Sequence, residues 1–186
     1  MTTPQRIASG IFCSSVVVVL FGTVPVFGKQ YGAPVQGKEN PKSPGRIEVL
    51  HSAAEEHYKL GLAYLREPQN TEKAVEHLEE AVELDRSNAE YHFKLAEAYA
   101  EDFSYANIFR KPFLATKVKM QLELAVQHNP SSVRYREGLI QYYMFAPVLL
   151  GGSFKKARDH AEALRMIDSY ASLLAHATVS AEEGEH

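Results

Sequence analysis

The feature that most constrains the fold of this chain is a pattern that returns after 35 residues. Four residues of one amphipathic segment recur in the same order and with the same spacing in a later segment. The two sets are His57, Leu60, Gly61 and Tyr64, followed by His92, Leu95, Ala96 and Tyr99. A period in the mid-thirties, with two helical segments per unit, is typical of helical solenoids.

Apolar residues within each unit follow the spacing of α-helices. From Ile47 onward they fall at steps of three and four, and a second such run extends from Ala74 to Leu84 after the REPQN stretch. Ser87 and Glu90 have the spacing of a capping box, which predicts that a third helix begins there. The chain is therefore expected to be all-α.

Small residues stand where two helices of one unit would meet. Gly61 and Ala96 would let the first helix of each unit lie close to the second. On the second helix of the first unit, Ala74 and Ala81 permit the same approach, and Leu78 fills the space between them.

These residues resemble the motifs of the tetratricopeptide repeat (TPR) family. The resemblance is strongest in the first repeat and fades along the chain, where the second and third repeats carry longer turns. It implies a right-handed superhelical stack of about three helix-turn-helix units with a short capping helix at its end. Besides the residues above, the motif positions are Val118, Leu122, Ala125 and Pro130 in the second repeat, and Leu139, Tyr143, Ala157, Ala161 and Leu164 in the third.

The sequence divides into a leader, a linker and a repeat domain. Residues 1–28 have the features of an export signal, with an apolar run from Ile11 to Phe27, although a run of this length also suits an uncleaved membrane anchor. We therefore expect a periplasmic protein, or one anchored in the membrane and facing the periplasm. The remaining segments are a Pro/Gly-rich linker at 29–46, repeats at about 54–88, 89–132 and 133–168, a capping helix at 169–178 and a polar tail at 179–186.

Charge and composition exclude several classes of function. The linker has a net charge of +3, whereas residues 47–186 hold 15 basic and 22 acidic side chains, so the folded body has no basic surface for nucleic acid. The single cysteine, Cys13, precludes an intramolecular disulfide and any cysteine metal motif. The eight histidines include no pair spaced four residues apart, so we predict neither a metal site nor a cofactor.

The resemblance also implies where a partner would bind. TPR proteins usually hold a peptide in the concave groove formed by the first helix of each repeat, and carboxylates beside two aromatic rings would suit a partner with apolar and basic residues. The alternative is a solvated acidic face with two packed aromatic rings. The matching positions are Tyr58, Leu62, Glu90, Phe93, Glu97, Glu101, Arg134, Glu137 and Gln141, with Glu55, Leu65 and Met144 beside them.

A long aromatic insertion, DFSYANIFRKPF at residues 102–113, separates the helices of the second repeat. Such a segment either folds over the core or serves as a contact surface, and packing is favoured because exposed apolar surface is costly in a soluble protein. The second possibility supports a different role, in which the protein assembles with itself through this insertion or through its terminal helix.

The stretch FAPVLLGGSFKKA, residues 145–157, decides between catalysis and scaffolding. Its glycines and lysines lack the order of a phosphate-binding loop, and no other enzyme motif is present. We therefore expect a turn between two helices, with 148–150 packed against the core, the glycines forming the turn and Ser153 capping the next helix. An anion site at Gly151, Gly152, Ser153 and Lys155 remains a lesser alternative. The aP-x-x-x-GG-S pattern resembles a group of exported bacterial TPR proteins.

Overall fold

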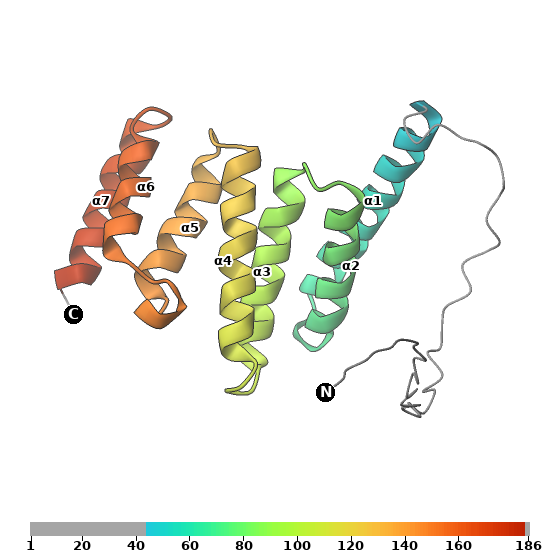
Figure 1. The fold of residues 1–186 in the computed structure, drawn as a ribbon, viewed down its shortest axis with the longest axis horizontal. Coiled ribbons are helices and arrows are strands. Elements are labelled where there is room, and N and C mark those ends of the chain that lie inside the picture. The colour runs from blue at the N-terminus through green and yellow to red at the C-terminus, as the bar shows by residue number, and fades with distance from the viewer. Residues whose placement is uncertain (1–43, 185–186) are drawn as a thin grey trace, which may run out of the picture. The chain divides into compact units, whose positions relative to one another are not determined.

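The computed structural model describes residues 44–184, so the expected signal and most of the expected linker lie outside it. Within this range the chain forms α-helices joined by short turns, with no β-strand (Figure 1). There are also two single-turn 3₁₀ helices. Pro68–Asn70 lies between the two helices of the first repeat, and Val148–Leu150 lies between those of the third. The α-helices are α1 (Pro44–Leu65), α2 (Thr71–Leu84), α3 (Ala89–Tyr105), α4 (Lys111–His128), α5 (Val133–Phe145), α6 (Phe154–Leu164) and α7 (Ser169–Gly184).

The helices form antiparallel pairs that stack in chain order. α1 packs against α2, α3 against α4 and α5 against α6, and each pair contacts the next. The last helix, α7, packs against both helices of the third pair. In Figure 1 the pairs follow one another in a row from α1 to α7. The expected all-α repeat stack, with three helical hairpins and a final helix, is confirmed.

The small residues of the repeat act as the sequence predicts. A Cβ atom at Gly61 would lie 2.6 Å from Cγ of Leu78, so only glycine allows α1 to approach α2 this closely. Ala74, Leu78 and Ala81 are fully buried in α2, and Ala96 is buried at the equivalent place in α3. This close contact therefore sets the distance between the two helices of a pair.

One hydrophobic core extends from α2 to α7. Its largest fully buried aliphatic side chains include Leu95, Leu139 and Leu164, each contributed by a different repeat helix. Leu60, which corresponds to Leu95 in the first repeat, is instead exposed. No helix pair precedes α1 within the described residues, so nothing there covers this position of the motif.

Helix ends differ from the sequence prediction in three places. Asn88, not Ser87, caps α3: its side-chain oxygen accepts hydrogen bonds from the backbone N–H groups of Glu90 and Tyr91, whereas Ser87 is bonded to Asp85. α7 continues to residue 184, past the expected capping helix and into the expected tail, because Val179 is fully buried against the core. α1 begins within the predicted linker.

The aromatic insertion does not fold over the core as predicted. Of its aromatic residues only Phe103 packs there, and four large side chains at the α3–α4 turn are exposed. The cause is local: the side-chain oxygen of Asn107 accepts hydrogen bonds of 3.1 Å from the N–H groups of Phe109 and Arg110, which closes a tight turn that extends beyond the helices. The exposed residues are Tyr105, Ile108, Phe109 and Phe113.

The second long turn, between α5 and α6, also differs in part. Val148 and Leu149 are exposed rather than packed on the core, while Leu150 is half-buried and its carbonyl oxygen accepts a hydrogen bond from the Tyr142 hydroxyl at 2.8 Å. The last residue of this 3₁₀ turn is thus anchored by a hydrogen bond, whereas the side chains of its first two residues are exposed.

Candidate partner-binding groove

The first helices of the three repeats are joined by one carboxylate, that of Glu90 on α3. The Tyr58 hydroxyl of α1 donates a hydrogen bond to it at 3.1 Å, and the Tyr135 hydroxyl of α5 donates another at 2.7 Å. Nη2 of Arg134, also on α5, lies 2.8 and 2.7 Å from the two carboxylate oxygens. Because these partners come from the repeats on either side of α3, Glu90 fixes the relative positions of the helices that form the groove.

The same contacts perturb the protonation of the group. Burial alone would raise the pKa of Glu90, but the hydrogen bonds from Arg134, Tyr135 and Tyr58 and the charge of Arg134 together lower it below its usual range. Burial, followed by the hydrogen bond to the Glu90 carboxylate, raises the pKa of Tyr135 to about 12. Glu90 is therefore ionised and Tyr135 neutral at neutral pH.

The aromatic residues expected to line the groove serve mainly to pack the repeats. Phe93 is buried, with its ring centroid 4.9 Å from that of Tyr135 and the guanidinium of Arg134 lying over its face at 4.4 Å. Tyr58 is half-buried and its ring lies 4.8 Å from that of Tyr91. Phe93 still lines the hollow between α3 and α5, whereas Tyr58 lines none of the hollows described below.

Three successive hollows lie along the groove, each between two neighbouring helices of the set α1, α3, α5 and α7. Their volumes are about 420 Å³ between α1 and α3, 300 Å³ between α3 and α5, and 220 Å³ between α5 and α7. Glu97 lines both the first and the second hollow, and Gln141 lines both the second and the third. The three hollows are thus one continuous surface that crosses the helices.

Each hollow combines apolar walls with a polar rim. Leu62 and Leu65 line the first, Ala96 and Leu122 the second, and Ile140, Met144 and Leu174 the third. Glu97 receives a hydrogen bond from Lys94 at 2.7 Å. Glu101 in the first hollow and Glu137 in the third make no ion pair with any of the described residues. Of the expected polar groove positions, these carboxylates and Gln141 are therefore the ones open to a partner.

Sequence reasoning did not predict the hydrogen bonds that join the second helix of one repeat to the first helix of the next. The Tyr99 hydroxyl donates to Glu79, which also receives Lys117 at 2.9 Å, and the Tyr143 hydroxyl donates to Glu123 at 2.8 Å. These pairs occupy equivalent places one repeat apart. The signal that could have revealed them is the Leu-Glu dipeptide at the close-packing position of α2 and again of α4, read together with the repeat tyrosines.

The histidines at the repeat position pack between helices. His57 and His77 lie with their Nδ1 atoms 3.1 Å apart, and buried His92 bonds Gln121 at 2.6 Å and stacks on His128. No group of three metal-ligating side chains occurs among residues 44–184.

The glycine turn before α6 uses its backbone donors internally. The N–H groups of Gly151, Gly152 and Ser153 bond the carbonyls of Val148, Pro147 and Tyr143, respectively. Gly151 has φ of 96°, and a Cβ atom at Gly152 would lie 1.7 Å from the carbonyl oxygen of Ala146. Ser153 caps α6 as predicted, accepting from the Lys156 N–H at 3.3 Å, and Lys155 pairs with Asp159 at 3.0 Å. An anion site here stays a prediction.

Comparison with known proteins agrees with this architecture. A family model for the TPR repeat matches residues 65–102, from the end of α1 through α2 and most of α3. Among solved structures, the TPR domain of Arabidopsis OM64 superimposes with a TM-score of 0.54 at 17% identity, covering 70% of this chain and 97% of that one. The chain carries the TPR fold. No curated protein matches it.

TPR folds are typically non-catalytic and generally bind protein partners. None of the described helices has the length and hydrophobicity needed to cross a membrane.

Proposed function

We propose that this TPR domain is a scaffold that binds an extended segment of another protein across the three hollows and catalyses no reaction. The supporting observation is their continuity: Glu97 and Gln141 each line two of them, so a single chain could pass from α1 to α7 without leaving the surface. Apolar side chains of the partner would enter the hollows, and Gln141 offers both a donor and an acceptor for its backbone.

The rim charges indicate what kind of segment would bind. Of the carboxylates that line the three hollows, Glu101 and Glu137 make no ion pair with any described residue, and Glu97 lies between them on the path. Carboxylates beside apolar hollows favour a partner in which basic and apolar residues alternate.

Peptide binding tests this proposal. Fluorescein-labelled short peptides in which leucines alternate with lysines or with glutamates are compared by fluorescence anisotropy, and the lysine peptide is expected to bind more tightly. An exposed ion pair contributes up to about 1 kcal/mol, so Glu97→Lys and Glu137→Lys should each weaken that binding roughly fivefold. Glu80→Lys, an exposed position on α2, is the matched control. Equal binding of both peptides, or equal effects of Glu80→Lys and Glu137→Lys, would refute the groove.

We further propose that the scaffold acts outside the cytoplasm on another envelope protein. The support is the N-terminal segment, with its basic start and apolar run, which lies outside the described residues. Fractionation of producing cells, followed by N-terminal sequencing of the mature protein, tests this. Recovery of the full-length chain in the cytoplasmic fraction would contradict it.

Self-assembly is a second candidate, because α7 exposes apolar side chains that no other described helix covers. Tyr170, Leu173 and Leu174 are all exposed on this last helix. In a repeat stack such a face is where a further helix would pack. Light scattering of the wild-type protein and of Leu173→Asp decides: an oligomer that the substitution dissociates supports this role, and a monomer at high concentration excludes it.

A further inference from the structure

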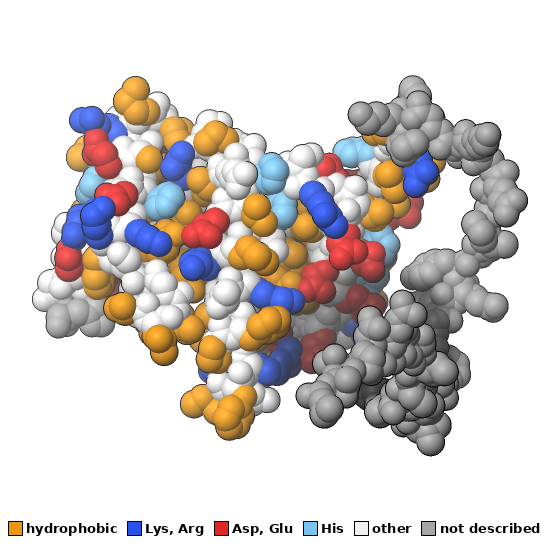
Figure 2. Space-filling model, in the orientation of Figure 1, with side chains coloured by type: hydrophobic (Ala, Val, Ile, Leu, Met, Phe, Trp, Pro, Cys, Tyr) orange, Lys and Arg blue, Asp and Glu red, His pale blue; other side chains and the backbone are white. Residues whose placement is uncertain are grey.

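The α3–α4 and α5–α6 turns present protruding apolar side chains at one edge of the stack. Ile108 and Phe109 are 76% and 90% exposed, and Val148 and Leu149 are 87% and 96% exposed. In Figure 2, hydrophobic side chains project beyond the ends of α3 and α4 at the lower edge of the molecule. A soluble protein rarely exposes several large apolar side chains together unless they make a contact.

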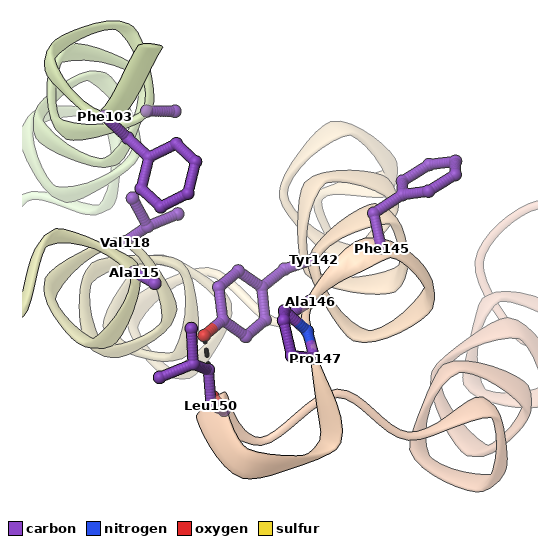
Figure 3. A pocket seen from close by; sticks show the side chains of 9 residues that line it. Phe103, Ala115, Val118, Tyr142, Phe145, Ala146, Pro147 and Leu150 are labelled. Carbon is purple, nitrogen blue, oxygen red and sulfur yellow. Dashed lines mark hydrogen bonds between the residues drawn. The ribbon is translucent and has the colours of Figure 1, made fainter. Parts of the chain in front are cut away.

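The surface between the two turns is also apolar. A pocket of about 200 Å³ is lined by Phe103 and Val118 from one side and by Phe145, Pro147 and Leu150 from the other. Figure 3 shows these side chains around the Tyr142 ring, whose hydroxyl is bonded to the carbonyl of Leu150. Helix residues beside the α3–α4 turn and residues of the α5–α6 turn line one pocket, so we group the two turns as a single surface, which we call the apolar edge (residues 103–113 and 145–150, with the pocket between them).

The charge of the chain near the apolar edge is opposite to that of the rest of the domain. Segments 103–122 and 138–158 contain no aspartate or glutamate, although residues 47–186 as a whole are acidic. Their basic residues are Arg110, Lys111, Lys117, Lys119, Lys155, Lys156 and Arg158.

Some of these basic side chains are in ion pairs with acidic residues and others are not. Arg110 pairs with Asp102 at 3.0 Å and Glu72 at 3.6 Å, and Lys117 pairs with Glu79. Lys155 and Arg158 pair with acids of α6 and α7, respectively. The cations without an ion pair to any described acid are Lys111, Lys119 and Lys156.

These three lysines lie beside the apolar edge. Lys111 is the first residue of α4, directly after the exposed tip of the insertion, and its ammonium lies 5.0 Å from the ring centroid of Phe103. The Lys119 ammonium lies 3.2 Å from the position of a Cβ atom at Gly151, next to the second turn. Lys156 is in the first turn of α6.

We propose that the apolar edge is a membrane-docking surface that inserts the tips of both turns into an anionic lipid bilayer. Apolar side chains at the tips would enter the boundary between headgroups and acyl chains, while the three lysines would contact anionic headgroups. Such an attachment lies on the bilayer rather than crossing it. The edge pocket shares Ala100, Val118 and Tyr142 with the hollow between α3 and α5, but the inserted tips and the three lysines line none of the groove hollows, so docking does not depend on the proposed peptide binding.

Protruding tips favour a bilayer over a second protein. Val148 and Leu149 are almost fully exposed side chains at the end of a turn, and a protein partner would need a matching pair of deep pockets to cover them and Phe109. A fluid bilayer accommodates such tips without a complementary shape, and an anionic one also matches the acid-free segments.

The absence of tryptophan from the sequence allows a direct test with the full chain. In Phe109→Trp the single tryptophan reports on the tip itself, even if another part of the chain also reaches the vesicles. Mixing with phosphatidylcholine–phosphatidylglycerol vesicles is expected to shift its emission to the blue, and lipids with brominated acyl chains are expected to quench it. Met166→Trp, an equally exposed site at the α6–α7 turn, is the control and should show neither effect.

The charge requirement is tested in the same Phe109→Trp background. Each lysine near an anionic surface contributes roughly fivefold in partitioning, so Lys111→Glu and Lys119→Glu should each weaken vesicle binding at least that much. Arg165→Glu, an exposed cation at the α6–α7 turn, should not. No blue shift at Phe109→Trp, an equal shift with pure phosphatidylcholine, or an equal shift at Met166→Trp would overturn the proposal. A shift that depends on protein concentration without vesicles would overturn it in favour of contact with a second copy.

Discussion

Replacing Glu90 with glutamine should loosen all three repeats at once, because this carboxylate contacts α1, α3 and α5. Glu90→Gln keeps the size of the side chain but removes its charge and turns one acceptor oxygen into a donor. The Tyr135 hydroxyl and one of the two contacts of the Arg134 Nη2 atom then lose their acceptor. The Tyr58 hydroxyl can remain bonded to the other oxygen.

The size of the effect follows from the exposure of these groups. The side chains of Glu90 and Arg134 are 32% and 52% exposed, so their ion pair is screened and contributes about 1 kcal/mol at most. The lost hydrogen bond from the half-covered Tyr135 hydroxyl adds about 1 kcal/mol. We therefore expect Glu90→Gln to lower the free energy of unfolding by about 2 kcal/mol, which corresponds to a Tm decrease of roughly 4–8 °C for a chain of this length.

Thermal and urea unfolding monitored by circular dichroism measure this loss. Glu97→Gln, two turns further along α3 and bonded only to Lys94, is the matched control and should change the free energy of unfolding by less than about 0.5 kcal/mol. If the two substitutions cost the same, the account of Glu90 as a link between repeats is refuted.

The difference between wild type and Glu90→Gln should also depend on pH. Glu90 has a lowered pKa in the folded state, so its charge stabilises the fold above the unfolded-state value of about 4.3. That contribution is lost as pH falls through the folded-state pKa. The two proteins should therefore converge in stability below about pH 4, and a difference that persists in acid would contradict the electrostatic explanation.

Three further substitutions or measurements test the packing. Leu78→Ala, at a fully buried position, should cost about 2–5 kcal/mol by chemical unfolding, whereas Leu60→Ala, at the exposed equivalent motif position, should cost less than about 1 kcal/mol. Gly152→Ala places a methyl group on a carbonyl oxygen at the end of α5 and should lower stability by about 1–3 kcal/mol or more. Gly45→Ala, in open space on α1, should not lower stability. Burial, aided by a nearby guanidinium, lowers the pKa of His160, so its NMR titration midpoint should fall below about 6.5, and a higher midpoint would contradict that burial.

The helices and their pairing could be predicted from sequence because their causes are local and periodic. A 35-residue recurrence fixes the unit, and Gly61 opposite Leu78 fixes how closely its helices approach. Both require only the spacing of small and apolar residues along the chain. The cap of α6 was predictable for the same reason, since Ser153 lies directly before a helical run.

The groove and the turns depend on contacts that spacing does not reveal. Phe93 matched a groove position, yet it is buried because Arg134 and Tyr135 of the next repeat cover it. The direction of the insertion depends on the tight turn that Asn107 closes, and this turn carries Phe109 away from the core. A composition rich in aromatic residues favours burial in general, but it carries no information about where the backbone of a turn leads.

The turns between the two helices of the second and of the third repeat form the apolar edge, whereas the first helices of the repeats form the groove. The relative positions of α1, α3 and α5 are set by contacts such as the hydrogen bonds from Tyr58 and Tyr135 to Glu90, none of which involves these turns. Residues added between α3 and α4 or between α5 and α6 extend the edge without moving the helices of the groove. Phe109→Asp should therefore abolish vesicle binding and leave peptide anisotropy unchanged, while Glu137→Lys should weaken peptide binding roughly fivefold and leave vesicle binding unchanged. If either substitution altered both activities, the groove and the edge would be parts of one site.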